Sequence, residues 1–478
     1  MVVGTGAGGA PVAYELARRG HAVLLLEEGR WFGRHEMVGR ASEARRAMFR
    51  EGGQTLAMGN VMMPVWTGVT VGGSTTVNSG TCYRTPQRIL RRWREELGLE
   101  GLTDEALAPH FEAVEAILGV APTPDRLLGG GARAIQAGLR ELGLESEAIG
   151  RNAPGCDGQG RCMFGCPTGA KASTNESYVP RALEAGAQLY TQTRATEVLL
   201  EGGRAVGVLA RTRGGATVRV KARATVLACG ALMTPILLLR QGIANGSGLL
   251  GRNLSVHPAA PVLARFPQRV EMQRNVPQSW AIEELAGDGV MIEESGNPPE
   301  VVAVALPFVG ARFVEAMERY EHLAAFGAMI EDDSRGRVRP GRGARVAITY
   351  SMSEADAAKL KRGVALAVEL CLASGAEVVY PAVRGFDEIV DAEGLARLRA
   401  ARLEPSDFAL SAVHPLGTAR MGVDPKTSVV GPTHECHDVP DLFIVDGAAV
   451  PTALGVNPQI TIMAMAHRAA ELLHARLD

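Results

Sequence analysis

The chain has 478 residues, of which 46% are apolar and 21% charged; these values are close to globular averages and exclude a disordered chain. Its 50 Lys and Arg residues against 52 Asp and Glu residues leave a net charge of -2, which gives no reason to expect a nucleic-acid partner. Seven cysteines are too few for a disulfide scaffold, and no run reaches the ~20 apolar residues of a membrane span. Because no signal peptide opens the sequence, we expect a cytoplasmic protein without a transmembrane segment.

The first thirty residues predict a dinucleotide-binding unit. A strand over residues 1–3 leads into Gly4-Thr5-Gly6-Ala7-Gly8-Gly9, a helix over residues 10–19 and a second strand that ends at Glu27. In such a unit the first glycine permits a tight turn, the second lets backbone N–H groups approach a pyrophosphate, and the third lets helix and strand pack closely. Glu27 stands where a ribose-binding acid belongs, although this segment does not separate FAD from NAD. The first strand is shorter than usual, so we expect further residues before Met1 in the natural protein.

The middle of the chain predicts helices, a cysteine-rich loop and a small antiparallel sheet. Helices are expected over 89–118, 132–144, 177–185 and 234–241, and the loop over 156–171. Strands are expected over 188–190, 195–200, 205–211, 218–220 and 224–228, with Gly-Gly pairs as hairpin turns. Between residues 257 and 410 Pro and aromatic residues increase, which indicates a separate substrate-facing part. A strand over 442–447 and an amphipathic helix over 460–477 then return to the nucleotide-binding pattern.

Four separated segments carry a family resemblance. The first is the glycine-rich turn together with Leu26-Glu27-Glu28-Gly29. The second is Gly72-Gly73-Ser74-Thr75-Thr76-Val77-Asn78, and the third is residues 230–238, Gly-Ala-Leu-Met-Thr-Pro-Ile-Leu-Leu. The fourth is residues 414–422, followed by Asp446-Gly447 and Gly455-Val456-Asn457-Pro458-Gln459. In order and spacing these segments resemble the glucose–methanol–choline (GMC) family of FAD-dependent oxidoreductases, nearest in look to cholesterol-oxidase-like and long-chain-alcohol-oxidase-like bacterial members.

The resemblance implies an α/β fold in which a Rossmann-like FAD-binding domain is interleaved with a substrate domain of mixed or antiparallel sheet and helices. We expect residues 1–85, 150–256 and 411–478 to form the FAD-binding domain. Residues 86–149 and 257–410 would form the discontinuous substrate-binding domain. Oligomeric state leaves no signal in the sequence.

The resemblance also assigns cofactor contacts. It implies that Gly4, Thr5, Gly6, Ala7, Gly8 and Gly9 hold the pyrophosphate and that Glu27 holds the adenosine ribose. Further contacts fall on Gly72, Gly73 and Asn78 along the flavin, Val198 at the adenine, Asp446 and Gly447 at the ribityl chain, and Asn457 and Pro458 at the pyrimidine edge. Some relatives attach FAD to a His just before the signature Asn. That position is Val77 here, so we expect non-covalent FAD.

The same resemblance places the catalytic pair at His414 and Asn457. Oxidation of an alcohol removes a hydride, which goes to flavin N5, and a hydroxyl proton, which needs an acceptor with a pKa near neutrality, as His has. A neutral amide can hold the substrate oxygen. We interpret His257 as a structural residue near the domain junction. Glu293 and Glu294 are candidates for an additional acid near the substrate, or else a solvated acidic pair at a strand end.

Two groups of possible metal ligands remain. Cys156, Cys162 and Cys166, with Pro167 after the last, permit an iron–sulfur cluster or a packed loop. His434 and His437 flank Cys436 without ligand geometry, because three residues within four positions crowd one loop. We therefore expect no metal and keep the cluster as an alternative.

We thus predict FAD-dependent oxidation of an apolar or lipid-like alcohol to an aldehyde or ketone. The partners would be the small-molecule alcohol and an electron acceptor that the sequence leaves open among oxygen, a quinone and a protein. The alternatives are a flavin-dependent lyase or photodecarboxylase on the same fold, or a sugar or polyol dehydrogenase with an iron–sulfur cluster.

Overall fold

A parallel sheet assembled from distant parts of the chain forms one side of the molecule. The computed structural model describes residues 1–37, 39–343 and 345–478, and five strands in it pair in the order β20-β12-β1-β2-β8. They are β1 (Val2–Val3), β2 (Leu24–Leu26), β8 (Gln188–Tyr190), β12 (Thr225–Leu227) and β20 (Leu442–Ile444). Each neighbouring pair runs parallel. Apolar residues fill these short strands because helices cover both faces, as parallel sheets require.

The helices around this sheet come from widely separated parts of the chain. They are α1 (Gly9–Arg18), α3 (Gln87–Leu97), α4 (Asp104–Leu118), α7 (Tyr178–Glu184), α8 (Gly230–Gln241) and α13 (Gln459–Leu477). Helix α13 packs against both α1 and α4. The single helix expected over 89–118 is in fact two helices. Gly98 ends α3 in a left-handed conformation, and the Thr103 hydroxyl caps α4 by accepting a hydrogen bond from the amide of Ala106.

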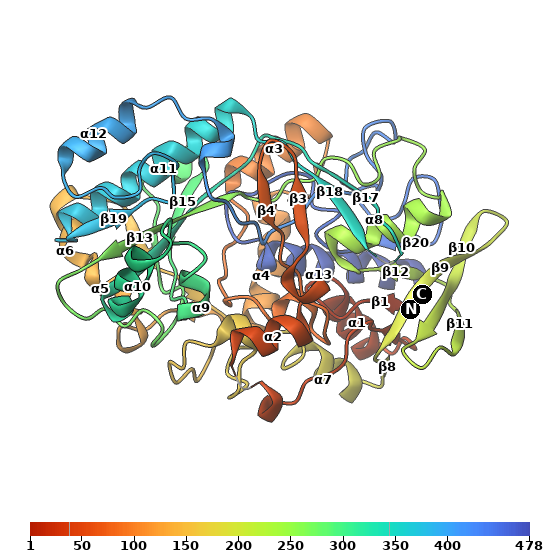
Figure 1. Ribbon diagram of the computed structural model, residues 1–478. Helices are drawn as coiled ribbons and strands as arrows, with labels where there is room; N and C mark the ends of the chain where they lie inside the picture. The colour runs from red at the N-terminus through yellow and green to blue at the C-terminus, as the bar shows by residue number, and fades with distance from the viewer. Residues whose placement is uncertain (38, 344) are drawn as a thin grey trace.

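Two smaller sheets adjoin this region. Strands β9 (Thr193–Glu201), β10 (Arg204–Thr212) and β11 (Thr217–Lys221) form the antiparallel sheet that the sequence predicts, with Gly202 and Gly203 in the first turn. Residues 188–190 do not join it, because β8 pairs with β2 at the edge of the parallel sheet. Strands β3 (Leu56–Met58), β4 (Met62–Pro64), β17 (Arg337–Pro340) and β18 (Val346–Thr349) form the other small sheet, in the middle of Figure 1.

A six-stranded antiparallel sheet forms the other side of the molecule (Figure 1). Its strand order is β19-β13-β16-β15-β14-β6. The strands are β6 (Ser146–Ala148), β13 (Ala259–Arg265), β14 (Trp280–Ile282), β15 (Val290–Glu294), β16 (Leu323–Ile330) and β19 (Val378–Tyr380). Helix α11 (Glu354–Ala373) packs across β13, β15 and β16, and α6 (Gln136–Leu142) and α12 (Ala392–Ala400) pack on α11. The face away from α11 is left to line a cavity.

The remaining elements are short and connect these sheets. They are α2 (Ala41–Met48), α5 (Gly130–Ala134), α9 (Pro299–Val302), α10 (Ala311–Glu318) and the pair of strands β5 (Ala121–Pro122) and β7 (Gly150–Arg151). The helix expected over 132–144 is divided between α5 and α6 at Ile135. None of the helices in the described part of the chain is long and apolar enough to span a membrane.

The predicted fold class is confirmed: a parallel nucleotide-binding-type sheet is interleaved along the chain with an antiparallel sheet covered by helices. The domain division stays a proposal. We propose one change to it, because the buried side chains of α3 and α4, such as Trp93 and Phe111, share a core with Leu26 and Leu227 of the parallel sheet. On that basis residues 86–118 belong with the FAD-binding part.

Candidate active site

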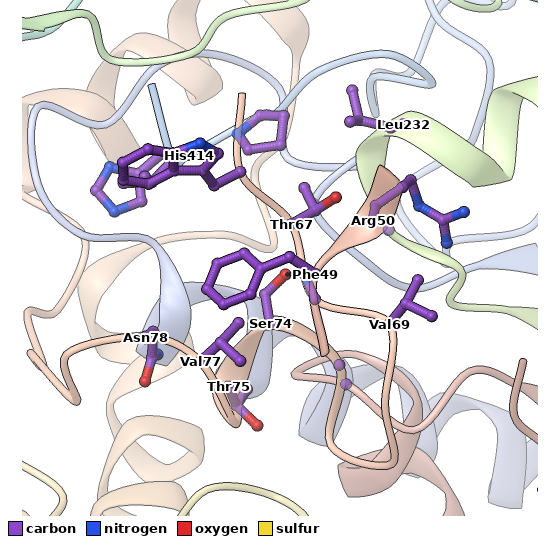
Figure 2. A pocket seen from close by; sticks show the side chains of 18 of the residues that line it. Phe49, Arg50, Thr67, Val69, Ser74, Thr75, Val77, Asn78, Leu232 and His414 are labelled. Carbon is purple, nitrogen blue, oxygen red and sulfur yellow. Dashed lines mark hydrogen bonds between the residues drawn. The ribbon is translucent and has the colours of Figure 1, made fainter. Parts of the chain in front are cut away.

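One large cavity, of about 1190 Å³, separates the two main sheets. At one end it is lined by the glycine-rich turn and the end of β2. Its middle is lined by residues 67–81 and the start of α8, and its other end by β13, β16 and the loops at 409–415 and 457–459. Figure 2 shows part of this cavity, with His414 on one wall and Thr75, Val77 and Asn78 on the loop opposite. The ends of the parallel strands thus meet the uncovered face of the antiparallel sheet.

The glycine-rich turn is closed tightly on three of its glycines and open at the fourth. A Cβ atom on Gly4, Gly8 or Gly9 would lie 2.2 Å or less from a backbone carbonyl oxygen. A Cβ atom on Gly6 would meet nothing nearer than 3.9 Å. Gly6 lines the cavity in front of α1, where the backbone N–H groups of a helix N-terminus favour an anion. The turn therefore forms a cradle that fits a pyrophosphate.

Glu27 is fixed beside this turn by hydrogen bonds that leave one acceptor position free. Its carboxylate accepts from the Thr5 amide at 3.1 Å, the Thr5 hydroxyl at 2.7 Å and the Gly29 amide at 2.8 Å. A carboxylate has about four acceptor positions, so one remains for a hydroxyl donor such as a ribose. Burial raises the pKa of this carboxyl, and the Thr5 hydrogen bond opposes that rise.

Asp446 has the same arrangement at the start of α8. Its carboxylate accepts from the Thr234 hydroxyl at 2.6 Å and from the amides of Gly230 and Ala448 at 2.9 and 2.7 Å. Burial raises its pKa, and these donors oppose the rise. Asp446 and Gly447 both line the cavity, so Asp446 also keeps one acceptor position for a hydroxyl of the cofactor.

The signature turn runs along the cavity wall between these two acids. Gly72 and Gly73 have φ values of 95° and 52°, a left-handed conformation that favours glycine. The Gly72 amide donates to the Thr5 hydroxyl at 2.9 Å, which joins this turn to the glycine-rich turn. Asn78 lines the cavity, and its side-chain amide donates to the oxygen of Gln459 at the start of α13. Gly73 and Asn78 thus line the cavity, and the flavin contacts that the resemblance implies for this turn stay a prediction.

Val198, the predicted adenine contact, is not among the residues that line the cavity. Its amide donates to the Gln241 side chain at 2.8 Å, and its carbonyl accepts from the same side chain at 2.7 Å. The cavity is lined instead by an earlier part of β9, including Arg194, Ala195 and Thr196. Strand β9 lines the cavity only from its start to Thr196, and the Val198 contact stays a prediction.

His414 and Asn457 meet at the far end of the cavity. The Nδ2 atom of Asn457 lies 3.5 Å from Nε2 of His414. The other polar atoms of the two side chains, His414 Nδ1 and Asn457 Oδ1, are buried without a hydrogen-bond partner among the described residues. Burial lowers the pKa of His414 to about 4, so its imidazole is neutral at neutral pH and can accept a proton. Pro458 is the N-cap residue of α13, so Asn457 stands directly before this helix.

His257 lies beside this pair. The centres of the His257 and His414 rings are 5.3 Å apart, and the planes of the two rings are inclined at 69°. Its Nε2 accepts hydrogen bonds from the amides of Leu454 and Gly455 at 2.7 and 3.3 Å. These bonds hold the loop that carries Asn457. The sequence marks His257 only as structural, and its place on the cavity wall follows from the fold alone.

Glu293 and Glu294 are both buried, so the solvated pair allowed by the sequence is wrong. Strand β15 points their side chains to opposite faces. Glu293 lines the cavity, accepts from Gln278 at 3.2 Å and is within hydrogen-bonding reach of Asn457. Glu294 faces Ser279, whose amide donates to it at 3.2 Å. Burial raises the pKa of each carboxyl to about 7.

Each of the three loop cysteines accepts a hydrogen bond at its sulfur. The sulfur of Cys156 accepts from the Gly158 amide, that of Cys162 from Arg151, and that of Cys166 from the Lys171 amide. The groups of three metal-ligating side chains found in the described residues do not include these cysteines. These groups concern a single metal ion, and the iron–sulfur cluster stays an alternative prediction.

The two histidines that flank Cys436 bind different partners. His434 Nδ1 lies 2.9 Å from the carbonyl of Ile444, and His437 Nε2 lies 2.9 Å from the Ser428 hydroxyl. Both imidazoles are engaged in holding the loop before β20.

A cavity that runs from a dinucleotide-type turn to a buried neutral histidine is the arrangement of an oxidoreductase that uses a nucleotide cofactor. Comparison with known proteins makes this class specific. The GMC oxidoreductase family models match residues 45–259 and 332–466. An uncharacterized GMC-type oxidoreductase of Mycobacterium tuberculosis is 38% identical over 486 residues, which cover 100% of this chain and 76% of that protein. A long-chain-alcohol oxidase of Arabidopsis thaliana is 30% identical over 98% of this chain and 67% of its own length.

The chain belongs to the GMC oxidoreductase family, whose members act on CH–OH donors. Among solved structures, pyridoxine 4-oxidase from Mesorbium loti has a TM-score of 0.73 at 19% identity and covers 99% of this chain and 98% of its own. A formate oxidase has a TM-score of 0.72 at 16% identity, with 99% and 97% covered. These two show the fold. The family and such FAD-containing neighbours support FAD as the cofactor.

Proposed function

We propose that this protein oxidises an apolar alcohol to an aldehyde or ketone, with non-covalently bound FAD, and that His414 accepts the hydroxyl proton. FAD, when bound, supplies the acceptor for the hydride. The observation that carries the proposal is the pairing of a neutral His414 with Asn457 at the end of a cofactor-sized cavity. Glu27, Asp446 and the Gly6 cradle would hold the cofactor at the other positions described above.

The 3.5 Å separation between the two nitrogen atoms suits a substrate hydroxyl. It is long for a direct hydrogen bond, and an oxygen placed beside both atoms can accept from Asn457 Nδ2 while it donates to His414 Nε2. As the hydride leaves, the hydroxyl proton passes to Nε2. The Asn457 amide then stabilises negative charge that develops on the oxygen. Proton transfer needs His414 in its neutral form, which burial provides, and the same burial makes this imidazole a weaker base than the near-neutral pKa expected from the sequence.

The substrate preference follows from the wall opposite this pair. The uncovered faces of β13 and β16 line the cavity with Pro261, Leu263 and Ala325, and the segment after α9 adds Ala305. Polar side chains also reach this part of the cavity, among them Gln278, Glu293, Ser295 and Ser411, so the apolar surface is that of the two strands. An apolar chain fits such a surface, because removing it from water is favourable. The similarity to a long-chain-alcohol oxidase supports the same substrate class.

The test is an anaerobic mixture of the FAD-loaded protein with aliphatic, aromatic, sterol and sugar alcohols. Bleaching of the oxidised flavin band is expected, and fastest with the apolar alcohols. His414→Asn should reduce the rate of bleaching by about 10²–10⁴-fold while FAD stays bound. His35→Asn, an exposed histidine outside the cavity, is the matched control and should bleach at the wild-type rate.

The outcomes separate the hypotheses. A normal rate in His414→Asn would contradict the proton-acceptor role. No bleaching with any alcohol would favour the lyase or photodecarboxylase, since neither passes electrons from an alcohol to the flavin. Readmitting air to the reduced protein then tests whether oxygen serves as the electron acceptor.

A further inference from the structure

Lys171 is a buried lysine behind the cavity wall. Its side chain is 1% exposed. Its ammonium donates to the carbonyl oxygens of Asn78 at 2.7 Å, Cys162 at 2.8 Å and Thr76 at 2.9 Å. These three bonds use all three N–H donors of the ammonium. The lysine thereby ties the cysteine-rich loop to the signature turn.

The charge of Lys171 has no carboxylate to balance it. Within the described part of the chain, the charged or titratable groups that face it are Cys162, Cys166 and Arg151. Taking a cation out of water is unfavourable unless negative charge compensates it, and carbonyl dipoles alone do so only in part. Burial accordingly lowers the pKa of Lys171 to about 8. A buried cation in this state is favoured by any negative charge that appears nearby.

The nearest place for such a charge is the cavity. Val77 and Asn78 line the cavity, and the ammonium binds the carbonyls on either side of this segment. Figure 2 shows Thr75, Val77 and Asn78 along this wall. Only one layer of backbone therefore separates the cation from the space that the sequence and the site assign to the flavin. Reduction by hydride adds an electron pair and one negative charge to the flavin.

We propose that Lys171 is a positioning residue that holds residues 76–78 against the flavin and, through its charge, raises the reduction potential of the bound FAD. The inference rests on the proposed function, because it needs FAD in this cavity. A fixed cation close to the flavin stabilises the reduced form, which carries the extra negative charge, more than the oxidised form. Hydride transfer from the alcohol then becomes more favourable.

The test replaces Lys171 by Met, which keeps an unbranched side chain, one atom shorter, and removes the charge. The midpoint potential of the bound flavin is measured by equilibration with a reference dye while the flavin absorbance is followed. Lys171→Met should shift the ratio of reduced to oxidised flavin about tenfold towards the oxidised form, a change of ~30 mV for two electrons. Lys171→Arg keeps the charge, so its midpoint potential should stay close to that of the wild type.

A matched control is Lys359→Met. The ammonium of Lys359 also donates to a backbone carbonyl, that of Glu331 at 2.7 Å, but Asp333 and Asp356 lie 3.5 and 3.8 Å from it. Lys359 does not line the cavity. Its replacement should leave the potential unchanged. An unchanged potential in FAD-loaded Lys171→Met would overturn the inference and leave a purely structural lysine.

The unmodified lysine gives a second measurement if Lys171→Met does not fold or does not retain FAD. Cys162 and Cys166 are first both replaced by Ser to remove the neighbouring thiols, and Arg151 keeps its charge throughout. Because reduction favours the charged lysine, the plot of midpoint potential against pH should steepen above about pH 8. A straight plot would overturn the inference. The dye titration needs no alcohol, so a failure of alcohols to reduce the flavin would count only against the proposed function.

Discussion

His414 shows how one side chain acquires its chemistry from its surroundings. An exposed imidazole is partly protonated near neutrality, whereas burial lowers the pKa of His414 to about 4 and keeps it neutral. His257 stands next to it, also neutral because burial and the neighbouring ring lower its pKa. The carboxyl of Glu293 is the acidic group on the same wall. The protonation state of the site near neutral pH therefore depends on Glu293 more than on either histidine.

The first prediction concerns this carboxyl. Burial raises the pKa of Glu293 to about 7, so it is neutral below that pH and ionised above it. An ionised Glu293 would stabilise the imidazolium that His414 forms when it takes the proton. We expect kcat/KM for alcohol oxidation to rise about tenfold as pH increases through 7, and Glu293→Gln to abolish this rise. The pH profile of anaerobic flavin reduction measures both.

The same carboxyl gives an independent check on folding. Between pH ~4.5 and ~7 the folded protein holds the Glu293 proton that the unfolded chain has released, so stability falls as pH rises through this window. Glu293→Gln should therefore unfold at a higher temperature than the wild type above pH 7 and at a similar one below pH 4.5. A pH profile of oxidation that survives in a well-folded Glu293→Gln would contradict the prediction.

At the scale of single residues, the sequence could predict what lies inside a motif. His414, Asn457, Glu27 and Asp446 are motif residues, and all of them reach the cavity. Which of two adjacent residues points inward depends on the face of a strand, and packing decides that. The sequence therefore gives Glu293 and Glu294 the same candidate roles, although β15 points their side chains to opposite faces. Lys171 stands in the cysteine-rich loop, and only the fold brings it behind the signature turn.

At the scale of elements, the turn before α1 is the part that the sequence describes best. Three of its glycines are required by backbone carbonyls that approach them closely, and the fourth faces the cavity. The spacing predicts the tight positions of Gly4 and Gly9 and the open one of Gly6, whereas Gly8 stands at a variable position of the pattern and its contact with the Val445 carbonyl is not predicted. Longer elements were harder to predict. The break between α3 and α4 depends on Gly98, and an apolar pattern that continues on both sides of the break conceals it.

The second prediction compares two glycines of this turn. Gly6→Ala adds a methyl group with no atom nearer than 3.9 Å, so the protein without FAD should keep its unfolding temperature. The methyl group occupies the cradle, and affinity for FAD should fall at least tenfold. Gly8→Ala places its Cβ 1.7 Å from the Val445 carbonyl and should instead destabilise the fold itself. Thermal unfolding without FAD and a fluorescence titration with FAD distinguish the two. Unchanged affinity in Gly6→Ala would remove the cradle from the proposed site.

At the scale of the whole molecule, the chain returns repeatedly to the same cavity. Its walls come from the first eight residues, from the signature turn, from β9 and β10, and from segments near residues 260, 326 and 414. The order of the motifs could predict this interleaving, because a cofactor site must collect them. Strand pairings such as that of β8 with β2 could not be predicted, since neighbouring apolar strands are alike in sequence.

The third prediction follows from a cofactor that would touch both main sheets. A ligand that binds only the folded chain stabilises it, by about 4 kcal/mol at a thousand times its Kd. Adding FAD to the flavin-free protein should therefore raise the unfolding temperature by several degrees. FMN, which lacks the adenosine that the turn and Glu27 would hold, should raise it less. Glu27→Gln keeps the size of the side chain but has one oxygen, which can accept from the Thr5 donors or from the Gly29 amide and not from both, and it should reduce the FAD shift towards that of FMN.

The same samples test how FAD is attached. With Val77 at the position of the attachment histidine, denaturation should release all the flavin into solution. Flavin that stays with the precipitated protein would contradict non-covalent binding. Equal shifts with FAD and FMN would remove the adenosine contacts from the turn and Glu27, and the cavity would then hold only the flavin end of its cofactor.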